Sequence, residues 1–329
     1  MKGKSHMSTA APHRPLPLEA NVVSPSKVVV RLAVLLAVVV AVAAAVGLFA
    51  SGGPGPHEVV TVRGQSVEVY GTGLYRHDSW LIGVGNRGSD AVTLFLEVPA
   101  LLAALVAYRR RSLRGTVILV GVLGWLLYYY ASMSLYTAYN RLFGLYVVAF
   151  GLALFAASLA LRSIDPVTFA AAFPTRPSRR LLVGYLGCLT AVLSLAWLPA
   201  LIADAATGDL PARLDVYSTE VTWALDLAVV VPAVAATGWL LHRNAVLGPL
   251  TATAMLALNV ALGVALAAQG VAQVVVGVPV KAGELFGAMA SFAVMTMVAA
   301  SLLLPLLRSL PAAPKAPKAG IAPAPAERR

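Results

Sequence analysis

Residues 28–50 read VVVRLAVLLAVVVAVAAAVGLFA, and this stretch decides the class of protein. A run of about 20 apolar residues is what an α-helix needs to cross a hydrocarbon core ~30 Å thick. A basic leader before an apolar run also fits a secretory signal peptide, but the apolar part of such a peptide has only about 7 to 15 residues. We therefore expect an uncleaved helix that spans a membrane.

The composition of the whole chain agrees with this assignment. Hydrophobic residues make up 59% of the 329 residues and charged residues only 12%, whereas soluble domains are about 25% charged. The net charge of +11 would suggest a nucleic-acid partner in a soluble protein. In a membrane protein the relevant question is how the charge divides between the two sides, so we expect no nucleic acid.

Seven more apolar runs follow, at about residues 91–108, 117–136, 142–161, 181–202, 223–241, 246–268 and 285–307. The sequence thus predicts an all-α polytopic membrane protein with eight transmembrane helices over residues 28–308. Residues 1–27 and the Ala/Pro/Lys-rich residues 309–329 are expected to be disordered tails, since neither composition can build a core.

The loop between the first two spans, residues 51–88, is polar and rich in glycine. Alternation of apolar and polar residues from Glu58 to Tyr70 predicts a short β-hairpin that turns near Gly64. The same loop contains the string GVGNRG, which matches the G-x-G-x-x-G fingerprint of dinucleotide sites. It follows no buried parallel strand, so we do not assign a nucleotide site.

The orientation follows from the positive residues, which are retained on the cytoplasmic side. With the N-terminus inside, 19 of the 25 Lys and Arg residues lie on the inner side and 6 on the outer side. The sequence therefore predicts that both termini are cytoplasmic and that the protein is a multi-pass protein of the bacterial inner membrane. An inner cluster is expected to contact anionic lipid head groups: Arg109, Arg110, Arg111 and Arg114.

The two halves of the chain share a plan. Each has an anchor span, an outer loop, a span with an acid and a later proline (Glu97 and Pro99; Asp226 and Pro232), a basic inner turn and two more spans. Four spans per half would make the halves parallel repeats about an axis normal to the membrane, as in some transporters.

Acids inside the apolar runs are the main functional candidates. Asp90 and Glu97 are seven residues apart, which places them on one face of an α-helix about 10 Å apart in depth. An acid near the centre of a spanning helix costs roughly 2.5 to 3.5 kcal/mol on insertion scales, so it is expected to face the protein interior. A protonated Glu97 that only packs against a neighbouring helix would explain the same pattern.

Other spans offer polar groups at similar depth. The third span carries Tyr129, Ser132 and Tyr136 along one stripe. Asp226 begins the sixth span, Asn259 lies in the seventh and Glu284 begins the eighth. Together with Asp90 and Glu97, these residues are predicted to line an outward-facing polar cavity between spans two, three, six, seven and eight.

The outer loop holds a second group of candidates: Tyr75, Arg76, His77 and Asp78. We expect Arg76 and Asp78 to fix the shape of the loop rather than to react. His57, His77 and Asp78 could be imagined as metal ligands with Asp90, but no zinc-type spacing of His and Cys occurs, so no metal or cofactor is expected.

Three strings carry a resemblance: YGTGLYRHDS, RRRSLRG and AYNRLFGLYVVAF. In this order they resemble a family of uncharacterised bacterial multispanning membrane proteins with a Y-G-x-G-L-Y-R-x-D-S signature, commonly with an aromatic residue where His77 stands. The likeness covers about residues 66–165. It implies that six loop residues matter together, Tyr70, Gly71, Gly73, Tyr75, Arg76 and Asp78, and it brings no activity with it.

The function most consistent with this pattern is the binding or movement of a small solute or lipid through the cavity. An alternative is a membrane-embedded enzyme in which Glu97 and Asp226 act as acid and base on an amphiphilic substrate. A third is a subunit or sensor whose outer loop docks a partner protein. The sequence leaves these three functions open and does not decide whether the protein is an enzyme.

Overall fold

The computed structural model describes residues 22–175, 177–208, 211, 214–278 and 282–310, the last range without the side chains of residues 282–289. Within this part of the chain, eight helices are long and apolar enough to span a membrane. Two of these spans are each built from three elements. The bounds of the spans are α1 (Lys27–Phe49); α2 (Trp80–Val92), η2 (Thr93–Glu97) and α3 (Val98–Arg109); α4 (Leu113–Leu135); α5 (Phe143–Arg162); α7 (Arg179–Thr207); α8 (Val221–Leu225), η3 (Asp226–Val230) and α9 (Val231–His242); α10 (Gly248–Val276); and α11 (Ala282–Ser309).

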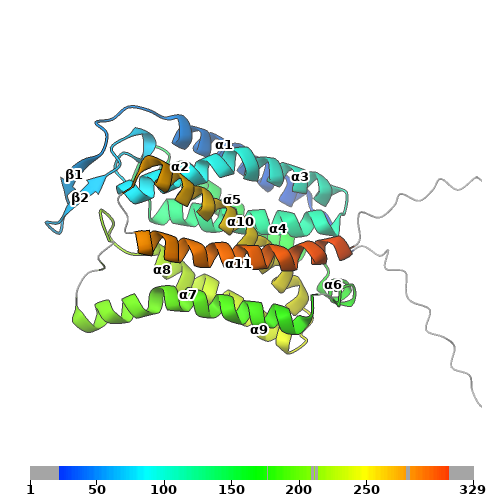
Figure 1. Ribbon diagram of the computed structural model, residues 1–329. Coiled ribbons are helices and arrows are strands. Elements are labelled where there is room, and N and C mark those ends of the chain that lie inside the picture. Colours follow the sequence, from blue (N-terminus) through cyan, green and yellow to red (C-terminus); the bar gives the residue numbers. More distant parts are fainter. Residues whose placement is uncertain (1–21, 176, 209–210, 212–213, 279–281, 311–329) are drawn as a thin grey trace, which may run out of the picture.

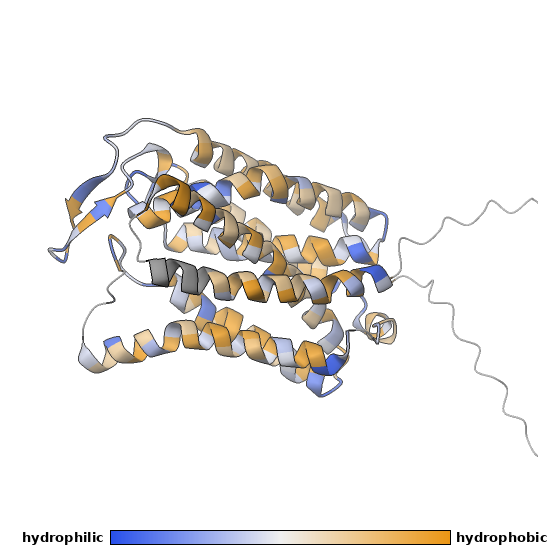
Figure 2. Ribbon diagram, viewed as in Figure 1, coloured by the Kyte–Doolittle hydropathy of each residue, from blue (hydrophilic) through white to orange (hydrophobic). Residues whose placement is uncertain are grey.

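The helices form an elongated bundle with the strands β1 (His57–Val60) and β2 (Ser66–Val69) at one end and the short helix α6 (Pro166–Ala171) at the other (Figure 1). Apolar residues cover the sides of the helices, while hydrophilic residues gather at the two ends (Figure 2). α4 lies at the centre, packed against α3, α5 and α10. The pair α7 and α9 forms a separate layer at the edge of the bundle (Figure 1).

The first helix of the chain, α1, begins near α6, and the last helix, α11, ends near it (Figure 1). The backbone N–H of Ser26 donates to the Tyr108 hydroxyl at the end of α3 (2.8 Å), and Arg114 at the start of α4 donates to the carbonyl of Leu310 (2.7 Å). The start of α1 and the end of α11 are therefore on the same side, as an even number of spans requires. Val23 also pairs with Ile164, so residues 22–26 belong to the folded body and not to the predicted tail; the rest of both predicted tails lies almost wholly outside the described residues.

The predicted hairpin is present. β1 and β2 pair antiparallel, with His57 opposite Val69, and Gly64 in the turn has a φ of +77°. Glycine adopts this left-handed conformation without the penalty that a side chain would bring.

The second span begins earlier than its sequence suggests. Residues 80–88 were expected in the loop, but they form the first turns of α2. A Cβ atom on Gly88 would lie 2.6 Å from the carbonyl oxygen of Ala268 on α10, and one on Gly83 would lie 2.7 Å from the Tyr70 side chain. The glycines that indicate a loop in the sequence instead allow the helix to pack closely, and this packing overrides their low helix propensity.

Two spans contain the same irregularity at the same place. A five-residue π-helical turn, η2 or η3, is followed by one residue and then by Pro99 or Pro232. Proline has no N–H to donate and its ring clashes with the carbonyl four residues earlier, so the helix widens before it. Each residue number in η3 and α9 equals the number of its counterpart in η2 and α3 plus 133. Asp226, for example, corresponds to Thr93 (226 minus 93 is 133).

The match continues through the following turn. α3 and α9 each have 12 residues, and two residues after each helix the chain adopts a left-handed conformation, at Arg111 (φ 59°) and at Asn244 (φ 54°). The backbone N–H of Arg111 donates to the carbonyl of Tyr108, and that of Asn244 donates to the carbonyl of Leu241. These are equivalent bonds under the same offset, so the two halves of the chain repeat one local architecture.

Candidate functional site

The outer loop folds back over the bundle. Gly71 and Gly73 both have positive φ, and Cβ atoms on them would lie 1.6 Å from the Gly55 carbonyl oxygen and 2.4 Å from that of Ala50. Only glycine fits positions with such close backbone contacts. The Tyr70 hydroxyl accepts a hydrogen bond from Arg87 on α2 (2.7 Å). Tyr70, Gly71 and Gly73 thus shape the part of the outer loop that covers the end of the helices, which we call the cap (residues 70–79).

Asp78 joins this cap to two other loops. Its side chain is only 1% exposed, and its Oδ1 accepts from the backbone N–H of Ala138 (2.8 Å) and from the Tyr217 hydroxyl (3.0 Å). Burial raises the pKa of Asp78 to about 7, although both hydrogen bonds act in the opposite direction. Arg76 is turned outward and donates to the ring of His77 (3.1 Å), while both residues are exposed. Asp78 therefore makes contacts of the kind expected from a residue that fixes the shape of the loop. Among the described side chains, no hydrogen bond joins Asp78 to Arg76.

Asp90 lies directly beneath the cap. Its Oδ2 accepts from the Tyr75 hydroxyl (2.6 Å), and the Tyr129 hydroxyl lies 3.5 Å from its Oδ1. Arg87 is near enough for its charge to act on this carboxylate. The loop residue Tyr75 and the α4 residue Tyr129 therefore meet at one buried acid.

Glu97 ends the π-turn and is also buried, with 4% exposure. Its Oε2 accepts from Thr93 (3.1 Å). Trp125 of α4 lies beside the carboxylate, yet neither its Nε1 nor the Oε1 of Glu97 has a hydrogen-bond partner among the described residues. Asp90 and Glu97 accept hydrogen bonds from different side chains, although both acids lie near Tyr129 and Tyr130 of α4.

Asp226 occupies the start of the second π-turn. Its two oxygens accept from the Tyr128 hydroxyl and from Trp197 Nε1, both at 2.8 Å, and Trp197 stacks on Trp223. Tyr128 and Tyr129 are adjacent on α4 and point about 100° apart, as helix geometry requires. Asp226 and Asp90 therefore lie on different sides of α4, and among the described residues no contact joins Asp226 to Glu97.

The remaining predicted residues lie in separate surroundings within the described part of the chain. Tyr136 stacks on Tyr217 with ring centroids 4.2 Å apart, and Ser132 is half-buried. Asn259 is buried on α10, and its Oδ1 has no partner among the described atoms. The side chain of Glu284 lies outside the described residues.

Sequence reasoning missed four residues that donate hydrogen bonds to the acids, Thr93, Tyr128, Trp197 and Tyr217. It also missed two aromatic neighbours of Glu97, Trp125 and Tyr130. The string WLLYYY in the third span carries four of the aromatic residues that gather around these acids. Because acids inside a span need polar partners, an aromatic run with hydroxyls on the next span was an available signal. Trp197 and Tyr217 had no such signal, since their positions depend on how distant helices and loops pack.

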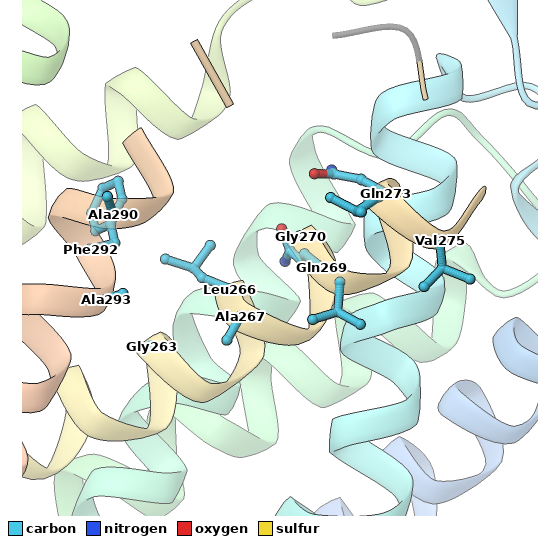
Figure 3. Close-up of a pocket in the computed structure, with 12 residues that line it drawn as sticks. Gly263, Leu266, Ala267, Gln269, Gly270, Gln273, Val275, Ala290, Phe292 and Ala293 are labelled. Atoms are coloured by element: carbon cyan, nitrogen blue, oxygen red, sulfur yellow. The ribbon is translucent and has the colours of Figure 1, made fainter. Parts of the chain in front are cut away.

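A groove of about 610 Å³ opens between α10 and α11 toward the hairpin end of the bundle (Figure 3). Its described lining is mostly apolar and includes Leu266, Ala267, Gly270, Phe292 and Ala293. Two glutamines at its edge connect it to α2: Gln269 donates to Ser89 (2.7 Å), and Gln273 donates to the carbonyl of Leu81 (3.1 Å).

The internal repeat relates a residue that lines the groove to a position in the first half that is occupied by an aromatic ring. Gly263 on α10 corresponds to Tyr130 on α4 (263 minus 133 is 130), and both positions face the next helix. Tyr130 lies against Tyr146 of α5, with ring centroids 6.2 Å apart, whereas Gly263 contacts Thr296 of α11. Aromatic rings fill the first half at this position, and the second half has no ring on α10 there.

No group of three or more His, Cys, Asp or Glu side chains in the described part of the chain could hold a metal ion. In comparisons with known proteins, no family model, no curated protein and no solved structure matches the chain.

Proposed function

We propose that this protein binds an amphiphilic, lipid-like ligand from within the membrane, with the apolar chain of the ligand in the groove between α10 and α11. The single observation that carries this proposal is the groove itself. Its volume of about 610 Å³ falls in the range of roughly 300 to 1,000 Å³ typical of small-molecule sites. An apolar groove between two spanning helices opens toward lipid, so a hydrocarbon chain is the ligand that matches its surroundings.

The polar end of the ligand would lie toward the hairpin end of the groove. Gln269 and Gln273 are there, and amide side chains can fix the orientation of a polar group. The buried acids support this choice over acid–base catalysis, because Asp226 has both oxygens occupied by Tyr128 and Trp197. We place the protein in the bacterial cytoplasmic membrane, with the Arg109–Arg114 turn toward anionic lipid head groups.

Photo-crosslinking tests the proposal. The protein would be reconstituted with a phospholipid that carries a photoreactive group on its acyl chain, and the labelled peptides would be identified by mass spectrometry. We expect labelling to concentrate on residues 263–275 and 290–293.

A matched pair of variants sharpens this test. Ala293→Phe fills the groove and should remove the concentrated labelling, whereas Ala196→Phe makes the same change on the exposed surface of α7 and should leave it intact. Labelling spread evenly over all exposed spans, or a pattern unaffected by Ala293→Phe, would refute the proposed ligand site.

A further inference from the structure

The surroundings of Glu97 contain polar atoms that lack partners. Oε1 of Glu97, Nε1 of Trp125 and the Tyr130 hydroxyl are all buried without a hydrogen bond to any described residue. These three side chains are 4%, 1% and 1% exposed. In folded proteins nearly every buried polar atom has a partner, and each exception calls for an explanation such as a bound water or ion.

The three atoms fit together chemically. Glu97 supplies an acceptor, while the indole and the phenol supply donors, and a buried water typically makes about three hydrogen bonds. The Tyr130 ring lies edge-on against the Tyr129 ring, with centroids 5.2 Å apart, and the Tyr129 hydroxyl lies 3.5 Å from Oδ1 of Asp90. Both Glu97 and Asp90 are near enough to Tyr130 to act on it electrostatically. Tyr129 and Tyr130 of α4 thus lie near both acids, and Asp90 also accepts from the Tyr75 hydroxyl under the cap.

The charges nearby leave Glu97 uncompensated. Arg87 acts on Asp90, and its side chain is held by Tyr70 and by the carbonyl of Leu48 at the end of α1. In the described structure no Lys, Arg or His side chain acts on Glu97. An isolated carboxylate at this depth is costly, and a proton is the smallest ligand that removes its charge.

The ionisable groups that face Glu97 come from few elements. Asp90 lies on α2, and Tyr129 and Tyr130 lie on α4. The other elements packed against η2 are α1 and α3, whose buried residues are apolar except for Tyr108 at the far end of α3.

We propose that Glu97 is a membrane-buried proton-exchange site connected to the hairpin side of the protein through Tyr130, Tyr129 and Asp90. A proton from water on that side binds the Glu97 carboxylate, and it returns to water along the same groups when it leaves. This site is separate from the lipid groove and does not depend on it.

Infrared difference spectroscopy between acidic and alkaline buffer tests the proposal in lipid bilayers. Protonation of Glu97 should produce a carboxylic-acid carbonyl band on acidification, and this band should shift when D₂O replaces water. Glu97→Gln should abolish this Glu97 component and leave the component from Asp78, whose pKa is about 7. Asp90→Asn should slow the D₂O shift by about tenfold or more, because it removes a relay group.

The internal repeat provides a matched control. Asp226 is a buried acid at the equivalent π-turn, but both of its oxygens have partners, so Asp226→Asn should leave the Glu97 band unchanged. If Glu97→Gln does not fold, Thr93→Val keeps the acid, removes its hydrogen bond and should move the pH midpoint of the band. The proposal fails if no acid-dependent band appears, if Glu97→Gln removes no component of it, if Asp226→Asn abolishes the Glu97 component, or if Thr93→Val leaves the midpoint of that component unmoved. The connection through Asp90 fails if Asp90→Asn leaves the D₂O shift as fast as in the unaltered protein.

Discussion

Asp78 is one side chain on which three loops depend. Its carboxylate receives hydrogen bonds from the α4–α5 loop at Ala138 and from the α7–α8 loop at Tyr217, while its own backbone carbonyl accepts from Tyr70. Tyr217 also belongs to the segment held by Arg63 of the hairpin loop, which donates to the Tyr217 carbonyl (2.9 Å). The loops at this end are therefore linked through buried polar contacts.

The burial of Asp78 predicts a pH dependence of stability. Its folded pKa of about 7 is higher than its ordinary value of 3.8, so the folded protein keeps this proton longer than the unfolded chain does. The free energy of unfolding should thus fall as pH rises from about 4 to about 7, by up to about 1.4 kcal/mol per pH unit, and level off above that. Thermal unfolding in detergent across this range measures the slope.

Two amide substitutions separate this effect from general titration. Asp78→Asn should remove this part of the slope, while Glu68→Gln, which neutralises an exposed acid on β2 of the same loop, should retain it. A slope that is unchanged in Asp78→Asn would show that the pH dependence arises elsewhere.

At the residue scale, the sequence predicts which acids are buried better than it predicts what they contact. Burial of Asp90, Glu97 and Asp226 follows from the free energy of placing a carboxylate in lipid. Partners depend on the rotation and depth of α4, and an error of one residue on a helix changes the direction by about 100°. Tyr129 was expected within reach of Glu97, and its hydroxyl lies 3.5 Å from Asp90; Tyr128, the partner of Asp226, was not identified.

At the scale of elements, the contact between α2 and α10 depends on glycine. Gly88 has the backbone of Ala268 and Gln269 within 3 Å of where a Cβ would lie. Gly187 on α7 is also helical, but nothing lies within 4 Å of its Cβ position. The two positions let one substitution be compared in two environments.

Gly→Ala should have opposite effects at these sites. Gly88→Ala must push α2 away from α10 and should destabilise the protein by about 1 to 3 kcal/mol. Gly187→Ala should stabilise it by up to about 1 kcal/mol, because alanine favours the helix more than glycine does. Unfolding midpoints of the two variants in one detergent measure the difference, and equal midpoints would show that α2 and α10 do not pack as described.

The sequence locates the spans because they are long and apolar, and seven of the eight begin within about four residues of their predicted starts. The start of α2 was missed because its small and polar residues indicate a loop unless a neighbouring helix is known to pack against them. The π-turns were also missed, although each proline marked their place. A proline in a span predicts an irregular helix, but not which kind.

At the scale of the whole molecule, the repeat constrains the topology. The turns after α3 and α9 have the same hydrogen bonds and each carries arginine, at Arg110 and Arg243. Two copies related by four spans have the same direction through the membrane, so both turns must lie on one side. Positive residues are retained in the cytoplasm, so we predict that both turns lie on the cytoplasmic side.

Reporter fusions test this arrangement. Alkaline phosphatase folds only outside the cytoplasm, so it should be active when fused after Gly208 or Gly277, which end α7 and α10 at the hairpin side, and inactive after Arg329. Fusion after Asn244 should also be inactive, because that turn is the counterpart of the turn at Arg111. An active fusion at Asn244 would contradict the parallel repeat even if the other three behave as expected, since it would place the two matched turns on opposite sides of the membrane.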